Sequence, residues 1–507
     1  MKTQPAPLGN VFDAARAHFE TTIADCEKIA KGSGDLAAIE VKMHERNREQ
    51  GRLLVEATLT LMGTRFDAVA LAGADGLDRG WRRVSGRTIL TTFGEVAFSR
   101  LGFHGKGAHA LFPLDGALNL PVDSRMSPAL QRHVARESAR GSFQQACDTV
   151  EAFLGVAPGK RQAEEAALAA VVDFNAYYEK KILKVDADKA GDLLVMTTDA
   201  KGIVVRTEDL REPTRTKAMT ETNKLSKRLS TGEKANRKRM AQVAACYDVA
   251  LFKRTADDVV DELAHELAQA KRPKPYNKRV WAGIVDESET IIQDLFNEAK
   301  RRDPEGVRPW VMLLDGNRAQ RQAVERLAKD APSSVTIIAD IIHVIEYVWS
   351  IVWLFFPEGT QAGQDWVTAR VHMILEGKSK EVCRQIRRFA ARRALSADGR
   401  KRVEVVAEYL TTMAPYLHYD VYLSQGLPIA TGVIEGACRY LVKDRMDITG
   451  ARWSVEGAEA VLRLRSLSAS EDFEAHWIFH QEQEFKHNHA ARYADPGMLR
   501  RTGLQAV

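Results

Sequence analysis

The sequence predicts a mixed α/β core with additional helical domains, and three observations support this prediction. Short apolar runs rich in Val, Ile and Met alternate with amphipathic helical patterns between residues 191 and 343, which is typical of a mixed sheet covered by helices. The segment from 344 to 425 has a helical pattern throughout. The chain has 507 residues, too many for one hydrophobic core, so roughly two to four domains are expected.

The composition is that of a soluble protein, with 45% hydrophobic and 28% charged residues and a mean hydropathy of −0.29. No apolar run approaches the roughly 18 to 20 residues that a membrane helix needs, and the amino terminus lacks the pattern of a secretory signal. The five cysteines are scattered and contain no CxxC pair, so neither a disulfide framework nor a zinc site is indicated. We therefore expect a cytoplasmic protein without a membrane partner.

The positive charge is concentrated in a few segments. The net charge is only +5, but residues 214–240, 271–279 and 384–393 are strongly basic. A solvated helix face explains any one such run. Because dispersed Lys and Arg stripes usually bind a polyanion, three runs in one chain make nucleic acid a candidate partner.

The first part of the chain divides into three regions. Residues 1–85 have the three- and four-residue apolar spacing of helices, and residues 86–122 alternate and contain glycines, as in a β-hairpin or small sheet. Residues 123–190 are helical again. Within them, SFQQACDTVEAFLGVAPGKRQAEEAALAAVVDF predicts helix, turn and helix, which fits either a helix-turn-helix that reads DNA or two antiparallel packing helices.

The second part contains the predicted sheet. Its strands are LLVMTT, VAACYDVALF, VWAGIV, WVMLLD and VTIIADI, all within 191–343, with amphipathic helices after the third and fourth. Residues 344–427 form a helical insertion, 428–470 return to the core with its last helix, and 471–507 form a helical tail.

Three acidic residues stand out in this core. Asp199 follows the apolar run LLVMTT, Asp315 follows WVMLL, and Glu435 lies near the start of an amphipathic helix. Ligands gather at the carboxyl ends of strands in open α/β sheets, and carboxylate oxygens are the ligands that Mg²⁺ prefers. Two such ions can activate a nucleophile and stabilise the leaving oxygen of a phosphodiester. Taken singly, each Asp is equally suited to capping a helix or forming a turn.

The residues around these acids resemble a known family. TTDAKGI, LLDGN, IIADIIHVIEYVW and ATGVIEGACRYLVKDRMDITGARWS are similar to segments of the ISKra-type insertion-sequence transposases. GEVAFSRLGFHG and FPLDGALNLP resemble the amino-terminal part of that family, so the resemblance runs from about 85 to 493. It implies an RNase H-like core with a DDE triad that binds two Mg²⁺ ions, or Mn²⁺ as a substitute. Matching the motifs assigns the triad to Asp199, Asp315 and Glu435.

The second member of the triad has a competitor. Asp340 also follows an apolar strand, and with His343 it forms a DxxH motif. The more distant Mutator-like and hAT-like transposases carry a C/DxxH motif in this place, after their second catalytic Asp. We therefore expect Asp315 to be the metal ligand and Asp340 and His343 to position the site or the DNA. Alternatively, His343 is a hydrogen-bonded core histidine.

Basic side chains near the predicted core could contact DNA phosphates. Arg439 and Lys443 are four residues apart and therefore on one helix face. The arginines of WVTARVHMILEGKSKEVCRQIRRFAARR, in the insertion, could follow the DNA backbone. Alternatively, the charges after Glu435 are only solvated and Trp453 packs in the core. The predicted DNA contacts are Arg228, Lys234, Arg237, Lys238, Arg239, Arg439, Lys443, Arg445, Arg452 and Trp453.

The resemblance implies a DNA transposase that cleaves strands at the ends of an element and joins them to target DNA. Its partners would be double-stranded DNA, namely the terminal inverted repeats and the target, and further copies of the same chain in a homodimer or higher homo-oligomer. Two alternatives remain: a domesticated, catalytically inactive DNA-binding protein, and an RNase H-like nuclease without strand transfer. Three intact acids argue against the first alternative.

Overall fold

The protein is an α/β chain of two compact units. The computed structural model describes residues 11–32, 35–63, 68–181, 192–220, 237–264, 272–430 and 432–500. One unit comprises Met1–Lys180 and Glu471–Val507, and the other comprises Lys181–Ser470. The second unit is therefore inserted into the sequence of the first. Within the described ranges, none of the helices is both long and apolar enough to cross a membrane.

The first unit contains the predicted hairpin. Strands β3 (Trp81–Thr91) and β4 (Gly94–Gly105) pair in antiparallel fashion along their whole length, and β5 (Ala108–Leu111) extends the sheet. The sheet region begins earlier than expected, because β1 (Leu71–Ala72) and β2 (Asp78–Arg79) lie in a region predicted to be helical. The turn between them explains the difference: Asp75 Oδ1 accepts from the amide of Leu77, and Gly76 has a φ of 73°.

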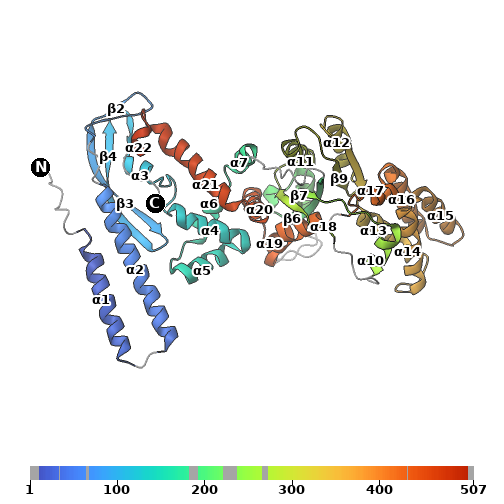
Figure 1. Cartoon of the computed structure of the whole chain (residues 1–507), viewed down its shortest axis with the longest axis horizontal. Helices are drawn as coiled ribbons and strands as arrows, with labels where there is room; N and C mark the ends of the chain where they lie inside the picture. Colours follow the sequence, from blue (N-terminus) through green and yellow to red (C-terminus); the bar gives the residue numbers. More distant parts are fainter. Residues whose placement is uncertain are drawn as a thin grey trace. The chain divides into compact units, whose positions relative to one another are not determined.

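Helices surround this small sheet. Helix α2 packs on β4 (Figure 1). At this contact Gly63 approaches the backbone of Ser99 so closely that a Cβ would clash. In the segment predicted as helix, turn and helix, Ser142 and Gln145 form a capping box and Gly155 ends the first helix at a φ of 65°. Its function in reading DNA stays a prediction. The helices before the core are α1 (Asp13–Ala30), α2 (Leu36–Gly63), α3 (Pro113–Ala117), α4 (Pro128–Arg140), α5 (Phe143–Leu154), α6 (Lys160–Ala169) and α7 (Phe174–Lys180).

The carboxyl-terminal tail is helical, as predicted, and belongs to this first unit. The hydroxyl of Tyr178 donates to Asp472 at 3.0 Å, and Nδ1 of His480 lies 2.8 Å from the buried carboxylate of Asp173. Leu499 packs in the same apolar cluster as the strands of the small sheet. The tail consists of α21 (Phe473–Glu484), η7 (Phe485–His489), η8 (Ala490–Arg492) and α22 (Gly497–Arg500).

The second unit is built on a five-stranded mixed sheet with the order β10-β9-β6-β7-β8. Strands β6, β7 and β8 form an antiparallel meander, whereas β9 and β10 run parallel to β6. All five predicted strands are therefore confirmed. Their bounds are β6 (Leu193–Val204), β7 (Lys238–Val249), β8 (Tyr276–Gly283), β9 (Trp310–Leu314) and β10 (Val335–Ala339).

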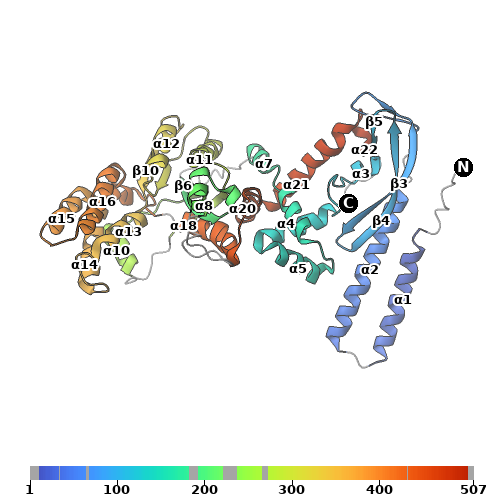
Figure 2. The same ribbon diagram turned by 180° about the vertical axis from the view of Figure 1, so that it is seen from behind.

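Helices cover both faces and one edge of this sheet. In Figures 1 and 2, α11 (Ser288–Arg302) lies above β6 and β7, and α18 (Gly432–Ala437) lies below them. Helix α20 (Val455–Ala469) covers the β8 edge, where Ser466 Oγ accepts from the amide of Ala282 at 3.1 Å and Glu459 accepts from that of Ile284. These bonds satisfy edge amides that would otherwise be free to pair with another chain. The remaining elements are η3 (Thr207–Asp209), α8 (Glu212–Thr220), α10 (Ala256–Ala264) and α12 (Arg318–Ala328).

A buried ion network fixes α11 to the sheet. Glu298 is 2% exposed and binds Arg279 of β8 at 2.6 Å and Arg302 at 2.9 Å. Burial raises the pKa of Glu298, but the positive charges of Arg279 and Arg302 outweigh it and bring the pKa down to about 2. A buried carboxylate needs such partners, because an unpaired buried charge is very costly.

The insertion between β10 and α18 is helical, as predicted. It begins three residues earlier than expected, since α13 (Ile341–Val352) starts directly after β10. Its aromatic core includes Phe355, Trp366 and Phe389, and the guanidinium of Arg393 lies 4.3 Å from the centre of the Phe389 ring. The other insertion helices are α14 (Gln361–Leu375), α15 (Ser379–Ala391), α16 (Ala397–Met413), η4 (Ala414–Tyr416) and α17 (Tyr419–Gln425).

Candidate active site

Three aspartates fall at the same level on three neighbouring parallel strands. The paired register of β6 and β9 ends at Thr197 and Leu313, and Asp199 and Asp315 lie two residues further along the chain from each. The register of β9 and β10 ends at Leu314 and Ala339, and the next residues are Asp315 and Asp340. The sheet thus brings the three acids to the carboxyl ends of its parallel strands, where open α/β sheets bind ligands.

Asp199 lies within β6 and not at its end. Its strand continues to Val204 because β7 continues to pair with it, and Asp199 itself is opposite Val243. Only the pairing with β9 stops, at Thr197. The half-buried carboxylate accepts a hydrogen bond from the thiol of Cys438 at 3.2 Å. Burial raises the pKa of the Cys438 thiol and the charge of Asp199 raises it further, so the thiol keeps its proton and donates.

Asp315 begins the turn after β9. Its Oδ1 accepts from the amide of Asn317 at 2.9 Å, and Gly316 follows with a φ of 99°. A Cβ on Gly316 would also lie 2.8 Å from the ring of Tyr409, so glycine is required here on two grounds. One carboxylate oxygen of Asp315 therefore stabilises the turn, as an Asp-Gly sequence allows, and the other oxygen stays available to a ligand.

Asp340 and His343 occupy the first turn of α13. Asp340 is 2% exposed and caps the helix, since its Oδ1 accepts from the amide of Ile342 at 2.8 Å. His343 is only half-buried, and its Nδ1 lies 3.2 Å from the carboxylate of Glu346. His343 is thus hydrogen-bonded but lies outside the core.

Glu435 reaches this group of acids from α18. Partial burial raises the pKa of Glu435; Asp340, Glu346 and Asp199 raise it further, and His343 opposes them. Within the described part of the chain, Asp199, Asp315 and Glu435 form no ion pair with a basic side chain. Among these described residues, the negative charges of the site therefore have no basic partner in ion-pair contact.

Mg²⁺ suits the donor chemistry of this site. All the acids offer carboxylate oxygens. Burial, and after it the charges of neighbouring carboxylates, raise the pKa of Glu435, and a divalent cation would relieve the repulsion between these charges. Among the residues with described placement, no three His, Cys, Asp or Glu side chains lie close enough together to hold a metal ion. The convergence of Asp199, Asp315 and Glu435 on one point stays a prediction.

The predicted DNA contacts of the 214–240 run differ in their surroundings. Arg228 and Lys234 lie outside the described residues. Lys238 is exposed, whereas Arg237 donates to a hydroxyl of η3 and Nε of Arg239 donates to a backbone carbonyl after β8. Lys238 is therefore the most accessible of the three described residues.

The predicted contacts after Glu435 divide into two groups. Arg439, Lys443 and Arg452 are exposed, and the first two lie in the π-helical segment η5 (Cys438–Lys443). Arg445 and Trp453 are buried and stack, with the guanidinium 4.7 Å from the ring centre. Burial lowers the pKa of Arg445 to about 10. This geometry favours the alternative interpretation, in which Trp453 packs in the core.

The other two basic runs are partly used within the protein. Arg279 is buried in the ion network of Glu298, and Arg387 pairs with Glu404. In the 384–393 run, Arg388 and Arg392 are exposed and could reach a phosphate.

Two residues of the site were missed by the sequence analysis. Cys438 lies three residues after Glu435, so helical spacing alone could have placed it on the same face. Tyr409 stacks on Tyr347 at a ring distance of 3.8 Å, and its hydroxyl is 3.4 Å from the carbonyl of Asp315. It comes from the insertion, and nothing in its local sequence connects it with β9.

No family model and no curated protein matches the chain.

Proposed function

We propose that this protein is a DDE-type DNA transposase with an RNase H-like core, in agreement with the sequence resemblance. The observation that carries the proposal is the alignment of Asp199, Asp315 and Asp340 at the carboxyl ends of the parallel strands. The charges of Asp340 and Asp199 also raise the pKa of Glu435, in addition to the effect of burial. The sheet order, a three-stranded antiparallel meander followed by two strands parallel to the first, supports an RNase H-like core. The helical insertion before Glu435 supports the more specific family.

Asp199, Asp315 and Glu435 would hold the Mg²⁺ ions. When bound, such ions supply Lewis-acid stabilisation of the phosphodiester and an activated nucleophile. Asp340 caps α13, so it positions the start of the helix that faces Glu435, and Cys438 orients Asp199 through its hydrogen bond. Because the pKa of Glu435 is raised, the fraction of Glu435 that is deprotonated and able to bind metal increases as the pH rises, and metal binding should increase with it.

The test is divalent-metal-dependent joining of a labelled terminal DNA fragment to a plasmid. Asp199→Asn keeps the side-chain shape and removes one charged ligand. We expect it to lower joining by about 1,000-fold or more, the equivalent of about 4 kcal/mol in the activation barrier, and to leave DNA binding nearly intact. Asp330→Asn, at an exposed position after α12, is the matched control. Full activity of Asp199→Asn would disprove the mechanism.

The same assay separates the alternatives. Binding without cleavage in the wild type indicates the domesticated DNA-binding protein, and cleavage without joining indicates a nuclease that lacks strand transfer.

A further inference from the structure

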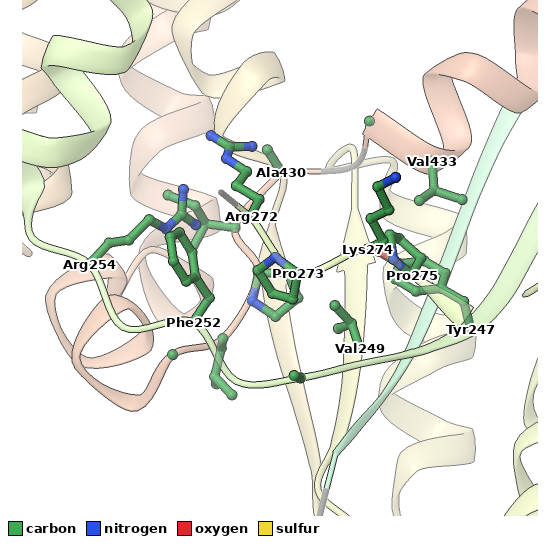
Figure 3. Close-up of a pocket in the computed structure, with 16 residues that line it drawn as sticks. Tyr247, Val249, Phe252, Arg254, Arg272, Pro273, Lys274, Pro275, Ala430 and Val433 are labelled. Carbon is green, nitrogen blue, oxygen red and sulfur yellow. The ribbon is translucent and has the colours of Figure 1, made fainter. Parts of the chain in front are cut away.

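A cavity of about 350 Å³ lies beside the loop that leads into α18 (Figure 3). Its walls come from the end of β7 and the loop after it, from the segment before β8, and from the chain between α17 and α18. The lining is largely apolar and includes the rings of Tyr247, Phe252, Pro273 and Pro275 (Figure 3). A ligand with a flat, apolar body would therefore find complementary surfaces here.

Among the described residues that line the same cavity, positive charge is in excess. Arg254, Arg272 and Lys274 all line it (Figure 3). The two arginines share one carboxylate, since Glu262 lies 3.7 Å from Arg254 and also pairs with Arg272. Lys274 is exposed and forms no ion pair with another described residue. A ligand with an anionic group would complete the charge balance.

One buried donor at the wall of this cavity has no acceptor in the part of the chain that the structure describes. The side chain of Arg254 is only 11% exposed, and its Nε has no hydrogen-bond acceptor among the described residues. A buried donor without an acceptor is destabilising and rare in native proteins. Arginine forms strong charge-assisted hydrogen bonds with phosphate, so the guanidinium of Arg254 favours a ligand that carries a phosphate group.

The cavity is connected to the candidate active site through its own wall. Ile429 lines the cavity, and its carbonyl accepts from the amide of Ile341, the residue after Asp340, at 2.9 Å. Val433 lines it from the first turn of α18, two residues before Glu435. A ligand in the cavity therefore contacts Ile429, which is hydrogen-bonded to the residue after Asp340, and Val433, which lies two residues before Glu435.

We propose that this cavity binds one unpaired nucleotide of the DNA strand that the acids process. The base packs against Phe252 and the prolines, and the phosphate binds Arg254 and Lys274. The volume suits a single nucleotide and excludes a duplex. The assignment to a processed DNA strand rests on the proposed function.

The test measures binding by the full chain without divalent ions, so that no cleavage occurs. The probe is a duplex with a three-nucleotide overhang that contains 2-aminopurine, compared with a blunt duplex of the same sequence. We expect tighter binding of the overhang and quenched fluorescence. Phe252→Leu keeps the apolar volume but removes the aromatic face, and should reduce the preference for the overhang by about tenfold. Lys274→Ala should weaken binding whichever base is present, and Lys253→Ala, exposed but outside the cavity, is its control.

Equal affinity of the wild type for overhang and blunt duplex would overturn the proposal, and so would an unchanged preference in Phe252→Leu. Free thymidine 5′-monophosphate binding as tightly as the overhang would overturn the assignment to a DNA strand. An overhang preference without end joining would disprove only the proposed function. End joining with no overhang preference would disprove only the cavity assignment.

Discussion

The thiol of Cys438 donates a hydrogen bond to Oδ2 of Asp199 at a distance of 3.2 Å. This contact joins β6 to the helix that follows Glu435, so it connects two acids that are more than two hundred residues apart in sequence. One carboxylate oxygen of Asp199 is thereby held in place, and its other oxygen bonds to the amide of Ala200.

Cys438→Ala should slow strand joining by roughly three- to tenfold, because the loss of one weak donor costs about 1 kcal/mol. Cys438→Ser keeps a donor at this position and should stay close to the wild type. Rates of joining at saturating DNA, with DNA affinity measured in parallel, check this prediction. Equal rates for Ala and wild type would show that the thiol does not position Asp199.

Asp315 and Asp340 can be distinguished by exchanging each for asparagine. Asp315→Asn should abolish joining and weaken Mn²⁺ binding, measured by titration calorimetry. Asp340→Asn should retain Mn²⁺ binding and most of the stability, because asparagine is also a good helix cap. The reverse result would reassign the second ligand to Asp340, which is the acid that acts more strongly on the pKa of Glu435.

Glu298→Gln should destabilise the second unit by about 3 to 5 kcal/mol, because it leaves Arg279 and Arg302 buried without their counter-charge. Glu289→Gln, on the exposed side of the same helix, should change stability by less than about 0.5 kcal/mol. Urea unfolding checks both values.

The same network predicts a pH dependence. The folded-state pKa of Glu298 lies at about 2, below its unfolded value, so its contribution to stability is present above that unfolded value. It should be lost as the pH falls from about 5 towards 2. Glu298→Gln should show a correspondingly flatter pH profile in this range, and an identical profile would contradict the assignment.

DNA binding should weaken steeply with salt. If about six phosphates are neutralised, the affinity should fall by about 1,000-fold between 50 and 200 mM salt. Lys238→Ala, at an exposed position, should reduce the slope of log affinity against log salt by about 1. Arg445→Met should leave the slope unchanged and lower the melting temperature, since Arg445 is buried against Trp453. A flat salt response would remove the electrostatic part of the interpretation.

The core strands were predictable because each is a continuous apolar run, and the mixed sheet with a helical insertion is confirmed. The end of β6, the first strand of the core, was not predictable. The apolar run stops at Asp199, but β6 continues because β7 pairs with it, and that pairing is a tertiary contact. The burial of Arg445 also depends on tertiary packing, since its stacking partner Trp453 lies eight residues away across a turn. Residues 428–470, expected to complete the core with its last helix, are helical in the structure and include α18 and α20.

The candidate site was predictable only in part. Apolar strands that end near acids identified Asp199, Asp315 and Asp340, and the register that aligns them became visible only in the sheet. The contacts of Cys438 and Tyr409 depend on how α18 and the insertion pack, which no local pattern encodes.

The placement of α21 in the first unit has a consequence for biosynthesis. Residues 181–470 can fold as soon as they leave the ribosome, whereas the first unit lacks α21 until the residues after 470 have been synthesised. Until then, the partners of α21, such as Tyr178 and Asp173, lack their hydrogen bonds to Asp472 and His480. A chain that ends prematurely near residue 470 would thus carry every acid of the site but leave its amino-terminal unit incomplete and prone to aggregation or proteolysis.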